Sequence, residues 1–527
     1  MDPDSVSALD LLVLADLHYV RQANHHCPIP ERNAHMGLEL AERAVRRALR
    51  QFQPDAIVLM GDLVDNGLAE NAAEDLIAIR TALGQFNIPI VVVPGNHDGP
   101  TDRLMAIFGD HLGAHEINGH QLITLATAYD DNDVARFDET DLALVARTTA
   151  TVPDQPIIVL QHNPIHPRIE SSYPYNPSNA EAAKRWYAAS NVVLSLSGHY
   201  HPGTPADTLD GVCYVTAPAL CQAPFRFLHA RVHNREVEIH EHSLETHADI
   251  PLWDIHCHTH YAYCRDNVTA TAAIERARLA DLGGVVITEH AGQLYLERED
   301  FWGGKFFDDP DLIRRNRHTP ACRMDDYLAE ILPLRSDTVL LGLECDGDGQ
   351  GGITLLDEDR GHWDMLIGAV HWLPHIDPAT ATTAELHARF MDESEAICRA
   401  GVDVLAHPFR YFRRGEMNPP RELYRPMARL LADTGVAAEI NFHTQQPDPR
   451  FFAACLDEGV KIAFGTDSHS LWEVGELWPH LNVLRQAGCS NGVATVLFTP
   501  HGGRNARPQF GRDGQTGTAP TGRPRHD

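Results

Sequence analysis

Short hydrophobic runs alternate with longer amphipathic stretches along almost the whole chain. In the first half, the runs cover residues 11–15, 56–60, 88–93, 157–160 and 192–196. Between them lie stretches with helical periodicity, such as 37–51 and 72–83, where apolar residues recur three and four positions apart. Strands that alternate with helices in this way predict an α/β fold.

The pattern changes over residues 212–240, where apolar and polar residues alternate as in antiparallel strands that close a domain. The segment 242–253 is the expected boundary, because a second and more regular series of strands begins there. The predicted strands of this series cover 252–255, 284–288, 338–343, 366–370, 402–406, 437–440 and 461–464. Helical patterns such as 270–282 and 383–400 separate most of these strands, which predicts a barrel of parallel strands.

We therefore expect a first domain over residues 8–245 and a barrel domain over residues 251–487. The segment 500–527 is rich in Gly, Pro and Arg and contains a single aromatic residue. Such a segment cannot bury enough apolar surface to fold, so it is expected to be a disordered tail.

The chain of 527 residues has 43 Lys and Arg against 73 Asp and Glu, for a net charge of −30. This acidity argues against binding nucleic acid or an anionic membrane over a broad surface. The 10 cysteines form no CxxC pair, the start of the chain lacks a secretory signal pattern, and no apolar stretch approaches the ~20 residues of a membrane span. We expect a soluble, cytoplasmic protein, and the sequence sets no oligomeric state.

Histidine, the commonest metal ligand among side chains, occurs 32 times. In the first half, polar motifs follow the strand-like runs directly: Asp16-Leu17-His18, Gly61-Asp62, Gly95-Asn96-His97-Asp98, Gln161-His162 and Gly198-His199-Tyr200-His201. Residues two apart share one face of an extended segment, and the carboxyl ends of parallel strands converge. One such motif is expected by chance, but five in order indicate a metal site for Mn, Fe, Zn or a similar ion.

The motifs DxH, GDxxDxG, GNHD, H and GHxH resemble those of the calcineurin-like metallophosphoesterases over residues 8–245. The form GDLVDNG with GNHD is most similar to the branch that contains cyclic-nucleotide and glycerophosphodiester phosphodiesterases. The resemblance implies a four-layer αββα sandwich, in which helices flank two sheets, and a dinuclear metal site.

The same resemblance implies the ligands. One ion would be held by Asp16, His18, Asp62 and His201, and the other by Asp62, Asn96, His162 and His199, with Asp62 bridging. His97 would act beside the leaving oxygen as an acid or transition-state stabiliser. Two such ions would neutralise phosphate oxygens and activate a water as hydroxide for attack on phosphorus. His25, His26 and Arg32, in the loop after the first motif, are expected to be solvated, with substrate contact as the alternative.

The strands of the barrel half also end in candidate ligands. They lead to His256-Cys257-His258, Glu289-His290, Glu344-Cys345-Asp346, His371, His407-Pro408 and Asp467-Ser468-His469. In barrels of this kind, catalytic residues sit at the carboxyl ends of the strands. These motifs resemble the polymerase-and-histidinol-phosphatase (PHP) family over residues 251–487, which implies a distorted seven-stranded barrel with two or three metals.

By position in the PHP pattern, one ion would be held by His256, His258, Glu344 and Asp467, and a second by bridging Glu344, His371 and His407. A third ion, if present, would be held by His290 and His469. The family often places another His shortly after HxH, and here either His260 or Cys264 can fill that position. Glu439 is expected to orient a ligand histidine.

Other residues of this half remain open to two interpretations. Arg410 can clamp a substrate phosphate by its fork geometry or serve as a surface ion-pair partner. Cys257 and Cys345 flank ligands but point to the opposite face, so we expect them in the core. The aromatic residues of 295–304 can line a substrate, although such loops more often only cover a barrel.

Two unrelated hydrolytic sites on one chain suggest a sequential reaction on a small-molecule phosphoester. The first domain would open a phosphodiester, which can be cyclic, and the barrel would hydrolyse the resulting phosphomonoester. Linking the two domains would raise the effective concentration of the intermediate. Three alternatives stay open: only one domain is active, the barrel is a nuclease, or the protein is a metal-binding scaffold without activity.

Overall fold

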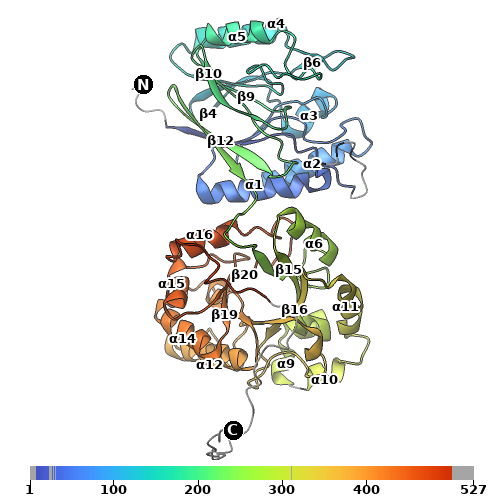
Figure 1. The fold of residues 1–527 in the computed structure, drawn as a ribbon, viewed down its shortest axis with the longest axis vertical. Helices are drawn as coiled ribbons and strands as arrows, with labels where there is room; N and C mark the ends of the chain where they lie inside the picture. The colour runs from blue at the N-terminus through green and yellow to red at the C-terminus, as the bar shows by residue number, and fades with distance from the viewer. Residues whose placement is uncertain (1–6, 23–26, 28, 30, 310, 501–527) are drawn as a thin grey trace, which may run out of the picture.

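The computed structural model describes residues 7–22, 27, 29, 31–309 and 311–500. Figure 1 shows two units stacked along the long axis of the molecule, the first made of layered sheets and the second of a barrel. Residues 501–527 of the expected tail, together with His25 and His26, lie outside the described residues. No helix within the described ranges is long and apolar enough to cross a membrane.

The first unit is built around two sheets. Its strands are β1 (Leu9–Leu14), β2 (Ala56–Leu59), β3 (Ile90–Val92), β4 (Gly113–Ile117), β5 (His120–Thr124), β6 (Ala128–Tyr129), β7 (Ala135–Arg136), β8 (Ile157–Leu160), β9 (Val192–Ser197), β10 (Thr204–Leu209), β11 (Val212–Thr216), β12 (Arg226–His233) and β13 (Glu236–Ser243). One sheet has the order β13-β12-β1-β2-β3 and the other the order β10-β11-β9-β8-β5-β4. β6 and β7 form a separate two-stranded ribbon.

Helices cover the outer face of each sheet. They are η2 (Ala34–Met36), α1 (Gly37–Gln51), α2 (Ala72–Gly84), α3 (Thr101–Phe108), α4 (Glu139–Thr151) and α5 (Ala180–Ala188). One apolar cluster lies between the sheets, a second packs the first sheet against α1 and α2, and a third packs the other sheet against α4 and α5. Figure 1 shows these layers in sequence, and they confirm the expected four-layer sandwich.

The strands predicted to close this domain separate into two sheets. β12 and β13 pair antiparallel and extend the first sheet, whereas β11 pairs with β9 and β10 in the second. The hairpin of β4 and β5 was missed, although Asn118-Gly119 between two alternating segments is a strong hairpin signal. Both turn residues adopt the positive φ that such a turn needs, 46° and 78°.

The second unit is a barrel of seven parallel strands in sequence order, as predicted. They are β14 (Trp253–Cys257), β15 (Gly284–His290), β16 (Val339–Asp346), β17 (Met365–Ala369), β18 (Val404–Leu405), β19 (Ala437–Ile440) and β20 (Ile462–Phe464). A parallel bridge between Cys257, the last residue of β14, and Ser468, four residues after β20, brings the two edge strands together and nearly closes the barrel. Cys257 and Cys345 are fully buried in the surrounding apolar core, as expected.

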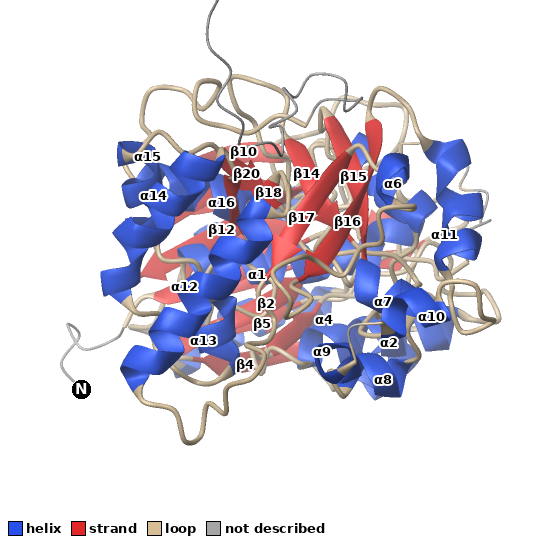
Figure 2. Ribbon diagram, turned by 90° about the horizontal axis from the view of Figure 1, so that it is seen from below, coloured by secondary structure: helices blue, strands red, loops and turns tan. Residues whose placement is uncertain are grey.

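Helices surround these strands, as Figure 2 shows. They are α6 (Ala270–Leu279), α7 (Ala291–Tyr295), α8 (Arg298–Trp302), α9 (Lys305–Asp308), α10 (Leu312–Asn316), α11 (Met324–Ile331), α12 (Thr383–Arg399), α13 (Arg410–Arg414), α14 (Tyr424–Thr434), α15 (Pro449–Asp457) and α16 (Trp478–Gln486), with the short turns η3 (Leu332–Leu334), η4 (Arg360–His362) and η5 (Arg421–Leu423). α12 starts at a capping box, since Thr382 and Glu385 each accept from the other's backbone N–H.

Helix α1 joins the two units. Its apolar face packs on the first sheet, and its other face carries arginines at positions 43, 46, 47 and 50. Arg43 donates to the backbone carbonyls of Trp472 and Val474 at 3.0 and 2.8 Å. The guanidinium of Arg46 lies 3.9 Å from the centre of the Trp472 ring, a cation–π distance. The segment that follows β20 in the barrel is therefore held by a helix of the first unit.

Two candidate metal centres

The first group of predicted ligands converges at the carboxyl ends of the strands of both sheets. His18 Nε2 lies 3.2 Å from His201 Nε2 and 3.7 Å from Asp62 Oδ2. On the other side of Asp62, the same oxygen lies 3.3 Å from His162 Nε2. Asp62 thus stands between two sets of donors, as a bridging carboxylate requires.

Two triads of donor atoms in this centre are close enough to hold an ion each. Asp16, His18 and His201 form one triad, and Asp62, His162 and His199 form the other, with all donor atoms of a triad within 4.8 Å of one another. The buried Nε2 atoms of His162 and His199 and the Oδ1 of Asn96 have no hydrogen-bond partner within the described residues. Unpaired buried acceptors are costly, so this donor set fits divalent metal ions.

Burial keeps most of these imidazoles neutral. It lowers the pKa of His18 to about 4 and, together with neighbouring histidines, the pKa values of His199 and His201 to about 3. Burial also raises the pKa of Asp16 to about 8. His162 is the exception, because Asp62 raises its pKa to about 9 against the effect of burial, so a metal ion held here would have to displace protons from both Asp16 and His162.

His97 lies beside this centre. Its Nδ1 is 2.7 Å from the carbonyl oxygen of Asp65 and donates to it, which leaves Nε2 free. Its ring centroid is 4.6 Å from that of His18, and its backbone N–H donates to Asp62. The donor atoms of His97, His18 and Asp62 also lie within 4.8 Å, so a ligand role competes with the predicted acid role.

Asp98 supports the first centre, a role that the sequence interpretation did not assign to it. Its carboxylate accepts from the backbone N–H groups of Asp62, Leu63 and Gly95, at 2.9, 2.6 and 2.9 Å. It thereby joins the loop that carries Asp62 to the loop that carries Asn96. Its place as the last residue of the GNHD motif is the sequence signal that could have indicated this role.

Glu344 is the centre of the second group. Its Oε1 lies 2.8 Å from His407 Nε2 and 3.6 Å from His371 Nε2. Its Oε2 lies 2.6 Å from His290 Nδ1 and 3.7 Å from the Nε2 atoms of both His256 and His258. Burial would raise the pKa of this carboxyl, but the surrounding histidines, His290 first, hold it well below its usual range. A buried carboxylate that reaches donors on both sides is suited to bridge two ions.

Asp467 lies next to this group. Its Oδ1 is 2.9 Å from His258 Nε2 and 3.7 Å from His256 Nε2. Against the effect of burial, the guanidinium of Arg410 keeps the pKa of Asp467 well below its usual range. Arg410 is itself buried, pairs with Asp467 and donates to Asn441 Oδ1 at 2.7 Å. The surface ion-pair interpretation of Arg410 is therefore wrong, and its role toward phosphate stays a prediction.

Several carboxylates orient these histidines from behind. Glu439 lies 2.8 Å from His256 Nδ1, as expected for an orienting residue. Glu289 does the same for His258 at 3.1 Å, and Asp346 for His371 at 2.7 Å. The sequence interpretation placed the last two in its candidate motifs but did not predict this orienting role.

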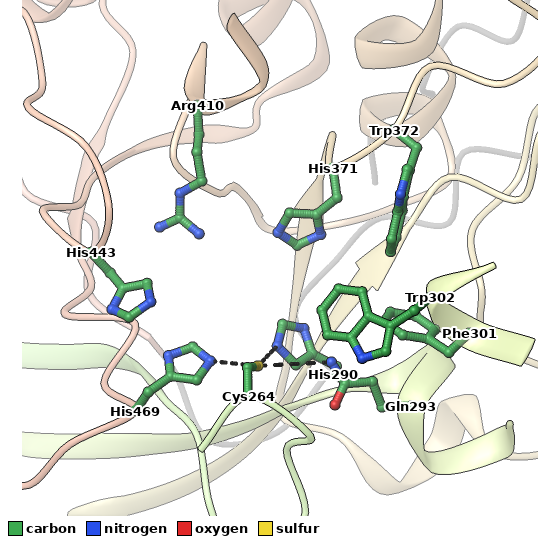
Figure 3. Close-up of a pocket in the computed structure, with 10 residues that line it drawn as sticks. All are labelled: Cys264, His290, Gln293, Phe301, Trp302, His371, Trp372, Arg410, His443 and His469. Atoms are coloured by element: carbon green, nitrogen blue, oxygen red, sulfur yellow. Dashed lines mark hydrogen bonds between the residues drawn. The ribbon is translucent and has the colours of Figure 1, made fainter. Parts of the chain in front are cut away.

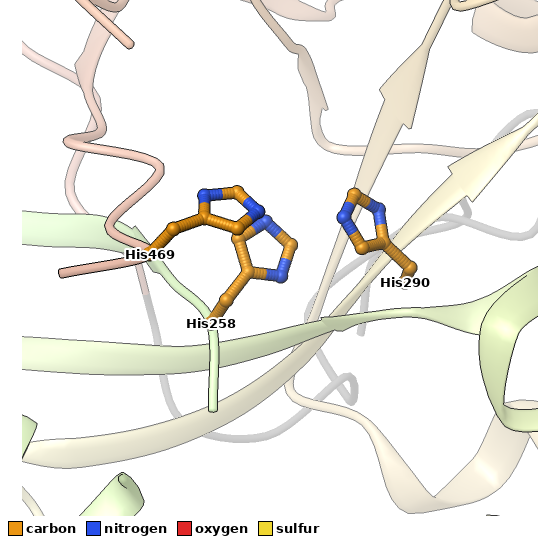
Figure 4. A group of neighbouring side chains, drawn as sticks. All are labelled: His258, His290 and His469. Carbon is orange, nitrogen blue, oxygen red and sulfur yellow. The ribbon is translucent and has the colours of Figure 1, made fainter. Parts of the chain in front are cut away.

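A third set of donors lies in the barrel centre, where most of its members line a pocket. The donor atoms of His258, His290 and His469 lie within 4.8 Å of one another (Figure 4). Cys264 Sγ adds to this group, 3.0 Å from His469 Nε2 and 3.5 Å from His290 Nε2 (Figure 3). His260, by contrast, faces Glu330 at 3.5 Å and is 43% exposed. Of the two residues that the sequence left open, only Cys264 reaches the centre.

Six of the predicted ligands share a rare backbone conformation. The residues Asp16, His18, Asp62, His199, His407 and Asp467 have φ between 31° and 68°. Non-glycine residues seldom adopt positive φ, and such conformations concentrate at functional sites, where the surrounding structure enforces them. Both centres therefore hold their side chains in place through strained turns at the strand ends.

Arg32 is not solvated as expected. It lies about nine-tenths buried and forms an ion pair with Asp65 at 3.2 Å, which places it behind the first centre. Asp65 in turn lies 3.4 Å from His18 Nδ1. Arg32 thus holds the carboxylate that faces a predicted ligand.

Two family models match the chain. Residues 9–203 match the calcineurin-like phosphoesterase family, and residues 254–443 match the PHP domain. The chain therefore joins a calcineurin-like phosphoesterase domain to a PHP domain, as its motifs predicted. These matches support a metal-dependent hydrolase of phosphoester bonds.

Among similar proteins, a cAMP/cGMP dual specificity phosphodiesterase of Mycobacterium tuberculosis is 27% identical over 220 residues, which is 40% of this chain and 67% of that protein. A probable cyclic nucleotide phosphodiesterase of Rhodococcus erythropolis is 23% identical over 32% of this chain and 58% of its own length. Among solved structures, a dimetal phosphatase of Danio rerio is 15% identical, with a TM-score of 0.38, over 45% of this chain and 96% of that one.

Proposed function

We propose that this protein is a two-site phosphoesterase whose first domain opens a small, cyclic phosphodiester and whose barrel hydrolyses the phosphomonoester that results. The observation that carries the proposal is the paired arrangement of buried carboxylates. Asp62 and Glu344 each stand between two groups of metal-binding donors, one in each domain. When bound, paired divalent ions supply positive charge to phosphate oxygens and activate water for hydrolysis.

Similarity to cyclic nucleotide phosphodiesterases supports the diester class for the first domain. The residues around the centre support it as well. Tyr173 and Tyr175 have ring centroids 5.6 and 5.5 Å from that of His199, so aromatic surface lies directly beside the predicted ligands. His97, with Nδ1 bound to a carbonyl, is held so that Nε2 can give a proton to the leaving oxygen.

In the barrel, Arg410 supplies a fixed positive charge at the pocket, where a dianionic phosphate would sit. A phosphomonoester carries one more negative charge than a diester, so a buried arginine favours the monoester. Glu439 and Glu289 keep the histidines of the centre in fixed orientations. Such fixed positioning is what phosphoryl transfer requires of a protein.

Product analysis tests this assignment. The manganese-loaded full chain is incubated with cyclic AMP, and nucleoside, monophosphate and inorganic phosphate are quantified over time. The wild type is expected to release nucleoside and phosphate, whereas a His256→Ala, His258→Ala double variant accumulates AMP. A double variant that releases phosphate at the wild-type rate would contradict the role of the barrel, and a wild type that leaves cyclic AMP and other cyclic diesters intact would contradict that of the first domain.

A further inference from the structure

The barrel centre opens into a pocket that is partly open to solvent. Figure 3 shows its two sides: Arg410, His443 and His469 on one, and Phe301, Trp302 and Trp372 on the other. Binding pockets for small molecules commonly pair a few polar groups with an apolar surface, as this one does. We call the three aromatic residues the aromatic wall.

The rings of the aromatic wall contact one another. Phe301 lies 5.2 Å, between ring centroids, from both Trp302 and Trp372, edge to face in each case. The two tryptophans are 6.3 Å apart and inclined by 61°, so they form a corner. Phe301 is fully buried behind this corner, whereas Trp302 is 42% exposed. Trp302 therefore presents part of its ring to solvent at the pocket.

The aromatic wall is held by the packing around it. Phe306 and Phe307 lie 6.0 and 6.2 Å from Trp372, so its ring has support from α9. Gly292 leaves the space that Phe301 fills, because a Cβ there would come within 2.6 Å of the Phe301 ring. Phe301 and Trp372 are thus held in place from behind.

The aromatic wall also lies next to the predicted ligands. Trp372 directly follows His371, and their ring centroids are 5.7 Å apart. The ring centroid of Phe301 lies 6.5 Å from that of His290. If a phosphate ester bound with its phosphate among these histidines, the two tryptophans would lie beside the organic group of the ester.

We propose that the barrel centre takes nucleoside monophosphates and stacks their base on Trp302 and Trp372. This inference rests on the proposed monoesterase function of the barrel and names its substrate class. Aromatic side chains bind bases by stacking without regard to their identity, since every base has a π face. In the reaction, water forms the new P–O bond and the ester P–O bond breaks. One proton of the water goes to the nucleoside hydroxyl, and the other stays on the phosphate.

The first centre is compatible with the same substrate family, because Tyr175 contacts both His199 and Tyr200, with centroid distances of 5.5 and 5.0 Å. Two centres that each place aromatic rings beside predicted ligands would suit a molecule that keeps its base through both steps. The base then serves as the common recognition element for the cyclic diester and for its product.

Competing substrates test the inference. Phosphate release by the manganese-loaded full chain is measured with AMP, ribose 5-phosphate and a long-chain alkyl phosphate. We expect kcat/KM for AMP to exceed that for ribose 5-phosphate about tenfold, and a Trp302→Ala, Trp372→Ala variant to remove this preference through KM. Trp186→Ala, an exposed tryptophan on α5, is the matched control and should change nothing. Trp372→Phe should retain most of the preference, because it keeps an aromatic face.

Equal rates for AMP and ribose 5-phosphate, equal losses for both in the double variant, or faster hydrolysis of the alkyl phosphate would overturn the inference. Calorimetry that measures AMP binding to the same proteins tests base stacking separately from the proposed monoesterase function. If no monoester is hydrolysed, the monoesterase assignment fails. Even then, binding of AMP about tenfold weaker in the double variant supports base stacking, and unchanged binding contradicts it.

Discussion

Arg47 and Glu476 join the two domains through a bidentate ion pair, with Nε–Oε1 at 3.0 Å and Nη2–Oε2 at 2.6 Å. Arg47 also donates to the backbone carbonyl of Leu244, in the segment that links the domains. Glu476 lies three residues beyond Glu473, whose carboxylate accepts from His443 Nδ1 and from the backbone N–H of His469, both at 2.8 Å. The contact between the domains therefore continues directly into the barrel centre.

Removing one partner of this ion pair should destabilise the protein strongly. We expect Arg47→Ala to lower the free energy of unfolding by up to about 3 kcal/mol, because it leaves buried Glu476 with only the longer ion pair to Arg43, 3.9 Å away. Thermal unfolding of the full chain measures the loss. Arg46→Ala, which removes a half-buried cation–π contact on the same helix, is the control and should cost less. An Arg47→Met, Glu476→Gln double variant should recover much of the stability, and failure to recover it would show that the charges themselves are required.

His97 should matter most when the leaving group is poor. An acid beside the leaving oxygen would contribute about 10²–10⁴-fold to kcat, so we expect His97→Gln to lower cyclic AMP hydrolysis by that factor. Cleavage of bis(p-nitrophenyl) phosphate should fall far less, because nitrophenolate leaves without a proton. The exposed His233→Gln is the control. Equal losses on both substrates, with loss of bound metal, would instead assign His97 as a ligand.

Cys264 should give the barrel centre a thiolate ligand. Its sulfur lies 3.0 Å from His469 Nε2 and 3.5 Å from His290 Nε2, and a metal held there would bind it as thiolate. Cobalt-substituted protein is expected to show a thiolate-to-cobalt charge-transfer band, which Cys264→Ser removes and Cys322→Ser retains. Persistence of the band in Cys264→Ser would exclude this cysteine as a ligand.

His480 should make the stability of the barrel depend on pH. Burial lowers its pKa to about 4, whereas the unfolded residue titrates near 6.5. Between these values the unfolded chain binds a proton that the folded chain does not, so stability falls as pH drops from 6.5 to 4. The loss should reach roughly 3 kcal/mol at 1.36 kcal/mol per unit of pH.

Denaturant unfolding at pH 6.5 and pH 4.5 measures this effect. His480→Gln removes the titrating group and should reduce the difference between the two pH values relative to the wild type. The exposed His318→Gln, also in the barrel, should leave the difference unchanged. Identical pH dependence in His480→Gln and wild type would show that His480 does not titrate in this window.

The sequence predicted the strands of the barrel and the convergence of the ligand motifs because both follow from local patterns. Short apolar runs mark buried parallel strands, and ligands lie at their carboxyl ends. The choice between His260 and Cys264 could not be read in this way. It depends on the turn at Thr259–Ala262, where Ala262 N–H donates to the Thr259 carbonyl and the chain brings Cys264 back to the centre.

Contacts between segments far apart in the sequence could not be predicted from it either. Arg32 pairs with Asp65, and α1 holds the segment after β20, because the chain brings these parts together only in the folded protein. Periodicity showed that α1 is amphipathic, but the partner of its arginine face is more than 400 positions away. Such pairs follow from tertiary packing and leave no local signal.

The central claim is that the chain has two active centres with divided labour. Hydrolysis of bis(p-nitrophenyl) phosphate and of p-nitrophenyl phosphate by manganese-loaded wild type, Asp62→Ala and Glu344→Ala tests it most directly. We predict that Asp62→Ala loses diester cleavage alone and that Glu344→Ala loses monoester cleavage alone. If one variant abolishes both activities and the other abolishes neither, a single domain is the enzyme and the account is contradicted.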